Sequence, residues 1–412
     1  MGRAKVKIWL VAASVLVSFF LLNGGCAFIP TFNNKLESIV NPYRFNIIGW
    51  ELRAIPLEIG GWILSRFKRP DDDVDTVNRY FQYVDRIKTL RTKTEAIRTG
   101  SSHGDLVALE ADITDLLGKR EVLDKKIERI ISNQIREALA NQDIYSPMDS
   151  LKLRISFPPL AFNLSEPPML LVVSSRNKIE SIREILLVQD IALDEMETLE
   201  NEVDELDVSS LILNIGGLAA YPSIVTNDAS LRFTLDTVTE EWLHQYLVFK
   251  PLGFLYLLDL TGMARNYEIA TMNETLAGMV SEEIGDIVYR SYYKEKAVQP
   301  QEESELDFDF NREMREIRRV VDQYLAQGEI EQAEKFMEQK RRFLISKNYY
   351  IRKLNQAYFA FYGTYADEPT SISPIGVEMR ELRQRSESLK DFLDTVAGMT
   401  SREELQQVLQ GE

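Results

Sequence analysis

His244 is one of two histidines in the chain and lies in the stretch "TEEWLHQYL", residues 239–247. On a helix Glu240 and His244 share one face because they are four residues apart, and Glu241 is displaced by about 100° around the axis. In the zinc-peptidase motif HExxH, the first and fifth positions bind the metal and the second is a general base that acts on water. The stretch matches this motif with glutamate in place of the first histidine. It therefore indicates a metal site with an altered ligand, the relic of such a site, or an ordinary acidic helix.

A third metal ligand would have to come from another part of the chain. The stretch "MNETLAG" contains Asn273, Glu274 and Ala277 and lies 30 residues beyond His244. In the gluzincin class of zinc peptidases, a second helix carries the pattern NExxA, and its glutamate is the third ligand. Glu274 is therefore the candidate that completes the site.

Three stretches together carry a more specific resemblance: "EEWLHQYL", "TMNETLAGMVSEEIG" and "KLNQAYFAFYGTY". They resemble the bacterial aminopeptidase-like family of gluzincin zinc metallopeptidases, which has HExxHQ, a downstream NExFA segment ending in E-x-G, and a late strip of the form NNA…Y. The resemblance covers roughly residues 205–410, and residues 40–150 show none.

The resemblance implies a metal centre and a catalytic base. It implies His244 and Glu274 as metal ligands, Glu241 as the general base, and Glu240 at the position of a ligating histidine. Two anionic ligands would weaken the Lewis acidity of the metal compared with one. Zn²⁺ is the expected cofactor, and the carboxylate-rich ligand set makes Mn²⁺ or Fe²⁺ an alternative.

The resemblance also implies a substrate cleft. Asn355, Tyr358 and Tyr362 would line it, and one of the two tyrosines would donate a hydrogen bond to the transition-state oxyanion. We expect a peptide or protein substrate to align along an edge strand near Asn214–Pro222. His103 lies in the turn "GSSHGD" and is expected to be a solvated turn residue.

Composition excludes several other functions. The 412 residues include 48 basic and 64 acidic side chains, a net charge of −16, which argues against nucleic-acid binding. The only cysteine, Cys26, excludes an intramolecular disulfide and a cysteine zinc cluster. The chain also lacks the GxxxxGK[ST] and GxGxxG patterns of nucleotide-binding proteins.

The N-terminus has the pattern of a targeting segment. Three basic residues precede an uncharged run from Ile8 to Pro30 that is about long enough to cross a bilayer. A retained signal anchor, a lipoprotein signal ending at Cys26 and a cleaved signal peptide all fit this run, and we favour the anchor. Each would place the main body outside the cytoplasmic membrane, so we expect a single-pass membrane protein.

The expected fold class is α+β and predominantly α, with a zincin-like lobe, a small mixed β-sheet, long helical hairpins and one N-terminal membrane-anchoring helix. Short apolar runs bounded by Pro, Gly, Ser and Asn predict strands between residues 151 and 235. A helix is expected from about Asp236. The expected divisions are an anchor at 1–30, a juxtamembrane aromatic segment at 31–70, a helical hairpin at 71–150, a sheet with the metal-motif helices at 151–296, an acidic loop at 297–310, and a C-terminal helical lobe at 311–412.

Helical periodicity predicts two long helical hairpins. The second helix of the first hairpin opens at Asp105. Its apolar residues follow spacings of three or four, interrupted only at Arg120: Leu106, Leu109, Ile113, Leu116, Leu123, Ile127 and Ile130. The second hairpin covers 311–347 and turns at "AQGEIEQ".

Two functions remain open from the sequence. The favoured one is a membrane-anchored extracytoplasmic metallopeptidase in which Glu241 acts on water at the metal. The alternative is a catalytically inactive peptidase-like scaffold or interaction protein at the membrane, because the first histidine of the motif is replaced.

Overall fold

The computed structural model describes residues 32–46, 73–147, 156–293, 308–366 and 371–411. Helices predominate and two small sheets accompany them, so the predicted predominantly helical α+β class is confirmed. The expected anchor at 1–30 lies outside the described residues, as do most of the aromatic segment and of the acidic loop. Among the described helices, none is both long and apolar enough to cross a membrane.

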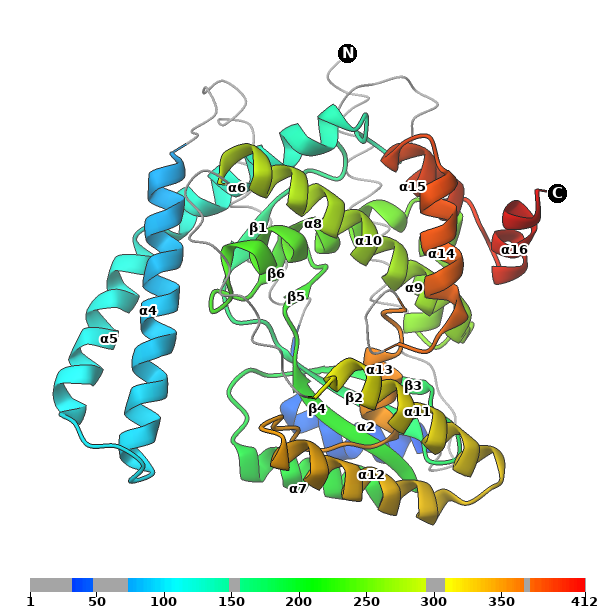
Figure 1. The fold of residues 1–412 in the computed structure, drawn as a ribbon, viewed down its shortest axis with the longest axis horizontal. Helices are drawn as coiled ribbons and strands as arrows, with labels where there is room; N and C mark the ends of the chain where they lie inside the picture. The colour runs from blue at the N-terminus through cyan, green and yellow to red at the C-terminus, as the bar shows by residue number, and fades with distance from the viewer. Residues whose placement is uncertain (1–31, 47–72, 148–155, 294–307, 367–370, 412) are drawn as a thin grey trace.

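The described chain forms two lobes and a projecting arm (Figure 1). The sheet lobe is built on an antiparallel sheet of order β3-β2-β4, formed by β2 (Met169–Ser175), β3 (Ser181–Leu187) and β4 (Val208–Asn214). Alternate residues of β2 face opposite sides of the sheet. One side packs on α2 (Phe32–Val40) and α7 (Leu193–Asp204), and the other on α13 (Gln356–Tyr362). The short helix η1 (Asn41–Tyr43) follows α2.

A helical hairpin completes the sheet lobe. It is formed by α11 (Phe310–Ala326) and α12 (Ile330–Ser346), which share an apolar core with α13. The turn contains Gly328 at φ +76°, a conformation that glycine adopts without steric cost. The predicted hairpin at 311–347 is therefore present.

The helical lobe surrounds two antiparallel helices, α8 (Leu231–Leu247) and α10 (Tyr267–Tyr292). Its other helices are α6 (Asp124–Asn141), α9 (Pro251–Leu260), α14 (Pro374–Arg385), α15 (Leu389–Ala397) and α16 (Arg402–Gln410). A second sheet of order β1-β6-β5 supports α8 and consists of β1 (Phe162–Leu164), β5 (Gly217–Leu218) and β6 (Ser223–Val225).

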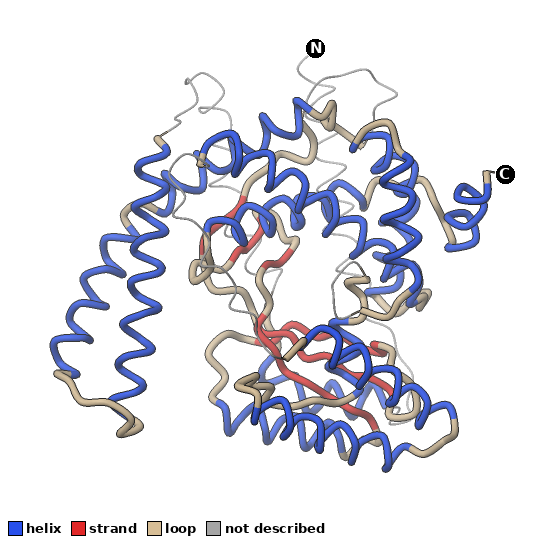
Figure 2. The backbone as a smooth tube through the Cα atoms, in the orientation of Figure 1, coloured by secondary structure: helices blue, strands red, loops and turns tan. Residues whose placement is uncertain are grey.

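The arm consists of α4 (Val74–Arg98) and α5 (Leu106–Glu121), which pack on each other and project from the body (Figures 1 and 2). His103 is exposed in the turn between them, as predicted. The second helix of the expected hairpin is instead two helices. It ends at Glu121, and Ile127 and Ile130 lie on α6, where they are buried in the core of the helical lobe.

Two further expectations about the organisation were wrong. The single mixed sheet expected at 151–235 is two separate sheets, one in each lobe. The division into a sheet lobe at 151–296 and a C-terminal lobe also differs from the structure, because the C-terminal hairpin belongs with β2–β4 and the last three helices pack on α10. Local patterns identify strands and helices but not which of them share a core.

A buried ion pair ties three elements of the sheet lobe together. Glu200 of α7 is only 2% exposed, and Arg352 donates to both of its carboxylate oxygens at 2.6 and 2.9 Å. Arg352 also donates to the carbonyl oxygen of Ile212 in β4 at 2.7 Å. Lys353 contacts the same carboxylate at 3.3 Å.

We expect Arg352→Met to destabilise the protein by about 3 kcal/mol, because it leaves the Glu200 carboxylate buried with too few compensating donors. Chemical denaturation followed by circular dichroism measures this change. The control is Arg342→Met, which removes an exposed pair with Glu338 and should cost less than about 1 kcal/mol. Equal losses for the two variants would contradict the assignment.

Candidate metal centre

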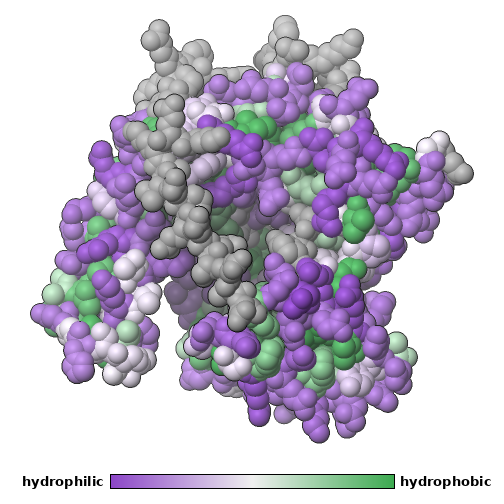
Figure 3. All heavy atoms as spheres, in the orientation of Figure 1, coloured by the Kyte–Doolittle hydropathy of each residue, from purple (hydrophilic) through white to green (hydrophobic). Residues whose placement is uncertain are grey.

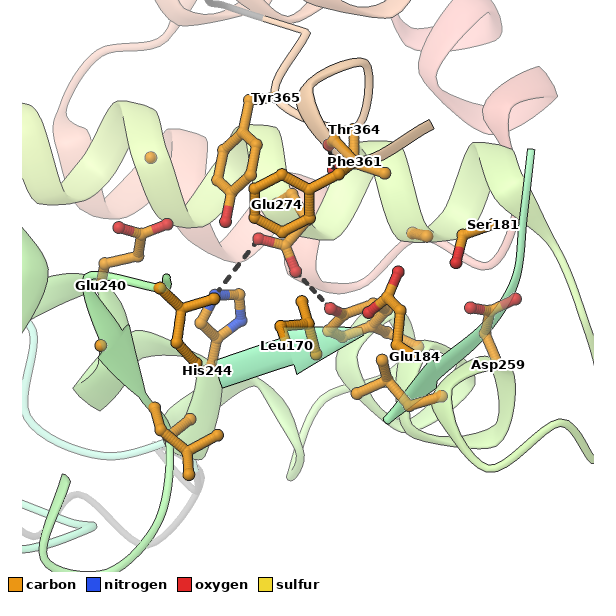
Figure 4. Close-up of a pocket in the computed structure, with 18 of the residues that line it drawn as sticks. Leu170, Ser181, Glu184, Glu240, His244, Asp259, Glu274, Phe361, Thr364 and Tyr365 are labelled. Atoms are coloured by element: carbon orange, nitrogen blue, oxygen red, sulfur yellow. Dashed lines mark hydrogen bonds and ion pairs between the residues drawn. The ribbon is translucent and has the colours of Figure 1, made fainter. Parts of the chain in front are cut away.

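Helices α8 and α10 bring the three candidate ligands together. Glu240 and His244 project from α8 and Glu274 from α10, and one ligand atom from each lies within 4.8 Å of the other two. The N-cap residue Ser230 begins α8, and Asn266 begins α10 by accepting from two backbone N–H groups. The three residues named from the sequence thus form one cluster, and Figure 4 shows it in the cleft.

The distances fit a small divalent cation. Nε2 of His244 lies 3.5 Å from Oε2 of Glu274. Ligand atoms about 2.0–2.1 Å from a tetrahedral Zn²⁺ are separated by about 3.3 Å. His244 and Glu274 therefore already have nearly this separation, and Glu240 needs to move by at most about 1.5 Å to reach the same ion.

Asn273 orients the imidazole of His244. Its Oδ1 lies 3.1 Å from Nδ1 of His244, and its side chain is fully buried. In the tautomer that donates from Nδ1 to this oxygen, Nε2 carries a lone pair directed at Glu274. Two acceptor atoms then face each other, an arrangement that a bound cation or a shared proton stabilises. This hydrogen bond from the ring nitrogen that does not bind metal is typical of metal-ligating histidines.

Tyr256 of α9 contacts both Glu274 and His244. Its hydroxyl donates to Oε1 of Glu274, which leaves Oε2 on the side of His244. Its ring also lies against the imidazole, with the ring centroids 6.0 Å apart. Burial and the neighbouring Glu274 raise the pKa of Tyr256, so its hydroxyl remains a donor at neutral pH. Tyr256 could not be identified from the sequence, since no motif connects α9 with the site.

Glu241 lies beside the cluster and is only 9% exposed. Burial, together with the charges of Glu240 and Glu274, raises the pKa of its carboxyl group well above the usual range. Gly217 of β5 passes close to it, and a Cβ atom there would lie 2.3 Å from Oε1 of Glu241. Glycine at this position lets the edge strand β5 approach the carboxylate.

The structure places a different tyrosine at the cluster from the two that were expected. Tyr358 and Tyr362 line the cleft and lie against each other, with ring centroids 4.6 Å apart. Figure 4 shows instead the hydroxyl of Tyr365 directed toward the carboxylates. Its pKa is raised by burial and by four carboxylates, those of Glu274, Glu240, Glu241 and Glu184.

Tyr365 is held in place by its chain neighbours. The hydroxyl of Thr275, next to Glu274 on α10, accepts from the backbone N–H of Ala366 at 3.1 Å and donates to the carbonyl oxygen of Thr364 at 3.5 Å. The only sequence signal for Tyr365 was its place at the end of "KLNQAYFAFYGTY".

The cluster lies in a cleft between the two lobes. The cleft has a volume of about 2310 Å³, larger than the roughly 300–1,000 Å³ of most pockets for small ligands. Figure 3 shows the mostly hydrophilic outer surface of the two lobes that border the cleft. Its lining includes side chains from both lobes, so it can accommodate an extended chain.

Comparison of the chain with known protein families, curated proteins and solved structures finds no match. The gluzincin resemblance therefore stays a prediction from sequence motifs. The case for a metal centre rests on the geometry of the described residues.

We expect the full-length protein to bind one Zn²⁺ and to lose that site on His244→Ala. Asn273→Leu should weaken Zn²⁺ binding by about 10–100-fold, because the imidazole loses the partner that orients it. Competition with a chromophoric chelator measures both affinities. His103→Ala is the matched control and should bind Zn²⁺ like the unchanged protein, since His103 lies in the exposed turn of the arm. Unchanged binding by His244→Ala would refute the site.

Proposed function

We propose that the protein is a metal-dependent peptidase, tethered at the outer face of a cytoplasmic membrane by its N-terminal segment. The observation that supports it best is the convergence of Glu240, His244 and Glu274 with the buried carboxylate of Glu241 beside them, all in one cleft. Burial of the Glu241 carboxylate costs desolvation free energy. A histidine with a purely structural role would not need such a carboxylate beside it.

Each group has a distinct role in peptide hydrolysis. A divalent cation held by the three ligands would supply Lewis acidity toward the scissile carbonyl group and the attacking water. Glu241 would take the proton from that water as the general base. It can then deliver the proton to the leaving amine.

The β5 strand offers a place for the substrate backbone. It is the edge strand in the order β1-β6-β5, so one side of Gly217–Leu218 has no neighbouring strand in that sheet. An extended peptide that pairs with this edge passes close to Glu241 because Gly217 has no side chain. This matches the edge expected near Asn214–Pro222.

Tyr365 is the group that we assign to the oxyanion. Its hydroxyl points into the cluster (Figure 4), and its raised pKa keeps it protonated at neutral pH. A protonated phenol can donate a hydrogen bond to the negative oxygen that develops during attack. Tyr358 and Tyr362 instead form part of the cleft wall.

We expect Glu241→Gln to lower kcat for peptide hydrolysis by about 10²–10⁴-fold with little change in Zn²⁺ affinity, because a proton-transfer group is lost while the ligands remain. Fluorogenic peptide hydrolysis measures the rate. In the unchanged protein, a chelator should abolish the activity and added Zn²⁺ should restore it. A protein that binds Zn²⁺ but cleaves no peptide would instead support the inactive-scaffold alternative.

Tyr365→Phe should lower kcat by about 10²-fold or more, since a hydrogen-bond donor to the oxyanion is removed. The matched control is Tyr362→Phe, which removes a hydroxyl from the same cleft at a residue that is 41% exposed. Steady-state kinetics of both variants on one peptide distinguish the two tyrosines. A larger loss for Tyr362→Phe would show that the oxyanion assignment is wrong.

A further inference from the structure

Of the four carboxylates that act on Tyr365, one has no role in the proposed chemistry. Glu184 lies in β3, and Figure 4 shows it in the same cleft as Glu274, on the side of Asp259 and Ser181. Because residues alternate along a strand, Glu184 is on the same side of the sheet as Leu186, which packs with the α13 side. Glu184 therefore faces the region where substrate would lie.

The surroundings of Glu184 are unfavourable for a negative charge. It is partly buried, and this burial raises the pKa of its carboxyl group, with Glu274 and Asp259 acting in the same direction. The hydroxyl of Ser181 and the more distant Arg265 have the opposite effect but do not offset the burial. A cationic partner would relieve this cost.

The negative charge of the neighbouring Asp259 is compensated by groups of the protein itself. It contacts the guanidinium of Arg265 at 3.6 Å and accepts from the backbone N–H of Asn266 at 2.6 Å. Arg265 is thereby engaged with Asp259. Within the described ranges, no Lys, Arg or His side chain forms an ion pair with Glu184.

The charges around the candidate centre also indicate that Glu184 needs a cationic partner. Four carboxylates, from Glu184, Glu240, Glu241 and Glu274, act on Tyr365. The two positive charges of a bound divalent cation would offset those of Glu240 and Glu274. Glu241 is the base and must stay available for the proton, so Glu184 is the carboxylate left for a cation from the substrate.

We propose that Glu184 forms a specificity subsite for a positively charged side chain, that of lysine or arginine, close to the scissile bond of the substrate. This inference rests on the proposed peptidase function and names the substrate class of the same site. A carboxylate that accepts a hydrogen bond from such a cation in a partly buried cleft should favour it by about tenfold or more over a neutral side chain of similar size.

The extent of the cleft favours a side chain over the amino terminus of the substrate. The lining does not stop at Glu184, because Figure 4 shows Ser181 and Asp259 on the side of Glu184 away from Glu274, and both line the same cleft. A subsite for a chain terminus would close the cleft at the carboxylate. Here the cleft extends beyond Glu184, which leaves room for more of the substrate chain.

Hydrolysis of matched peptides by the zinc-loaded full-length protein tests this proposal. The peptides have the same Ala/Gly sequence, blocked at both ends, with lysine, norleucine or glutamate at one central position. Mass spectrometry of the products locates the cleaved bond. We expect the kcat/KM of the lysine peptide to exceed that of the norleucine peptide by about tenfold or more.

Variants of Glu184 identify the residue responsible. Glu184→Gln should reduce the preference for lysine to less than about twofold, and Glu184→Lys should shift the preference to the glutamate peptide. The matched control is Glu180→Gln, in the same cleft wall, where Glu180 pairs with Lys178 at 2.6 Å. It should keep the preference of the unchanged protein.

The outcomes separate this inference from the proposed function. Equal hydrolysis of the lysine and norleucine peptides, or a preference that survives Glu184→Gln, overturns the subsite while the peptidase function stands. If lysine is preferred only in peptides that have a free amino terminus, the subsite is also overturned. If no peptide is cleaved, the peptidase function fails, and calorimetric binding of the same blocked peptides tests the subsite. The subsite is supported if the lysine peptide binds at least about tenfold more tightly than the norleucine peptide and Glu184→Gln removes this difference. Equal binding of the two peptides overturns the subsite.

Discussion

The packing of α8 against α10 fixes the distance between the candidate ligands, because two of them project from one helix and the third from the other. His244 contacts Asn273 and Glu274, and Arg232 pairs with Asp286. Asp236 lies against Gly285, where a Cβ atom would be 1.8 Å from the Asp236 carboxylate. The buried core of the helical lobe holds this antiparallel alignment.

Hydroxyl and amide groups complement the negative charge around this helix pair. Tyr256 donates to Glu274, and Asn273 holds the imidazole of His244. The hydroxyl donor orients a carboxylate and the amide oxygen orients an imidazole, and neither group neutralises the negative charge. The negative charge of the centre therefore remains available for cations from outside the chain, as both the proposed metal centre and the proposed subsite require.

The sequence was sufficient for features that depend on short spacings. The common face of Glu240 and His244 follows from helix geometry, and both the hairpin at 311–347 and most strands follow from local periodicity. Glu274 needed a motif, because no local rule joins α10 to α8. Tyr365 and Glu184 could not be found in this way, since their places depend on a turn after α13 and on a strand of the opposite lobe.

The division of the strands between two sheets was unpredictable for the same physical reason. Each strand pattern reports burial on its faces but not the identity of its neighbours. β4 and β5 are separated by only two residues in the chain, yet they belong to different sheets and different lobes. Tertiary packing decides such a division.

The chain passes between the lobes several times, and two of these crossings lie at the candidate centre. The link from β4 to β5 brings Gly217 to Glu241, and the link from α13 to α14 carries Tyr365. Any hinge motion of one lobe against the other must bend these links. It would therefore displace the β5 edge at Gly217 and the side chain of Tyr365 together. Opening of the cleft would then move Gly217 and Tyr365 relative to Glu241 and the candidate ligands, which stay together on the paired helices α8 and α10.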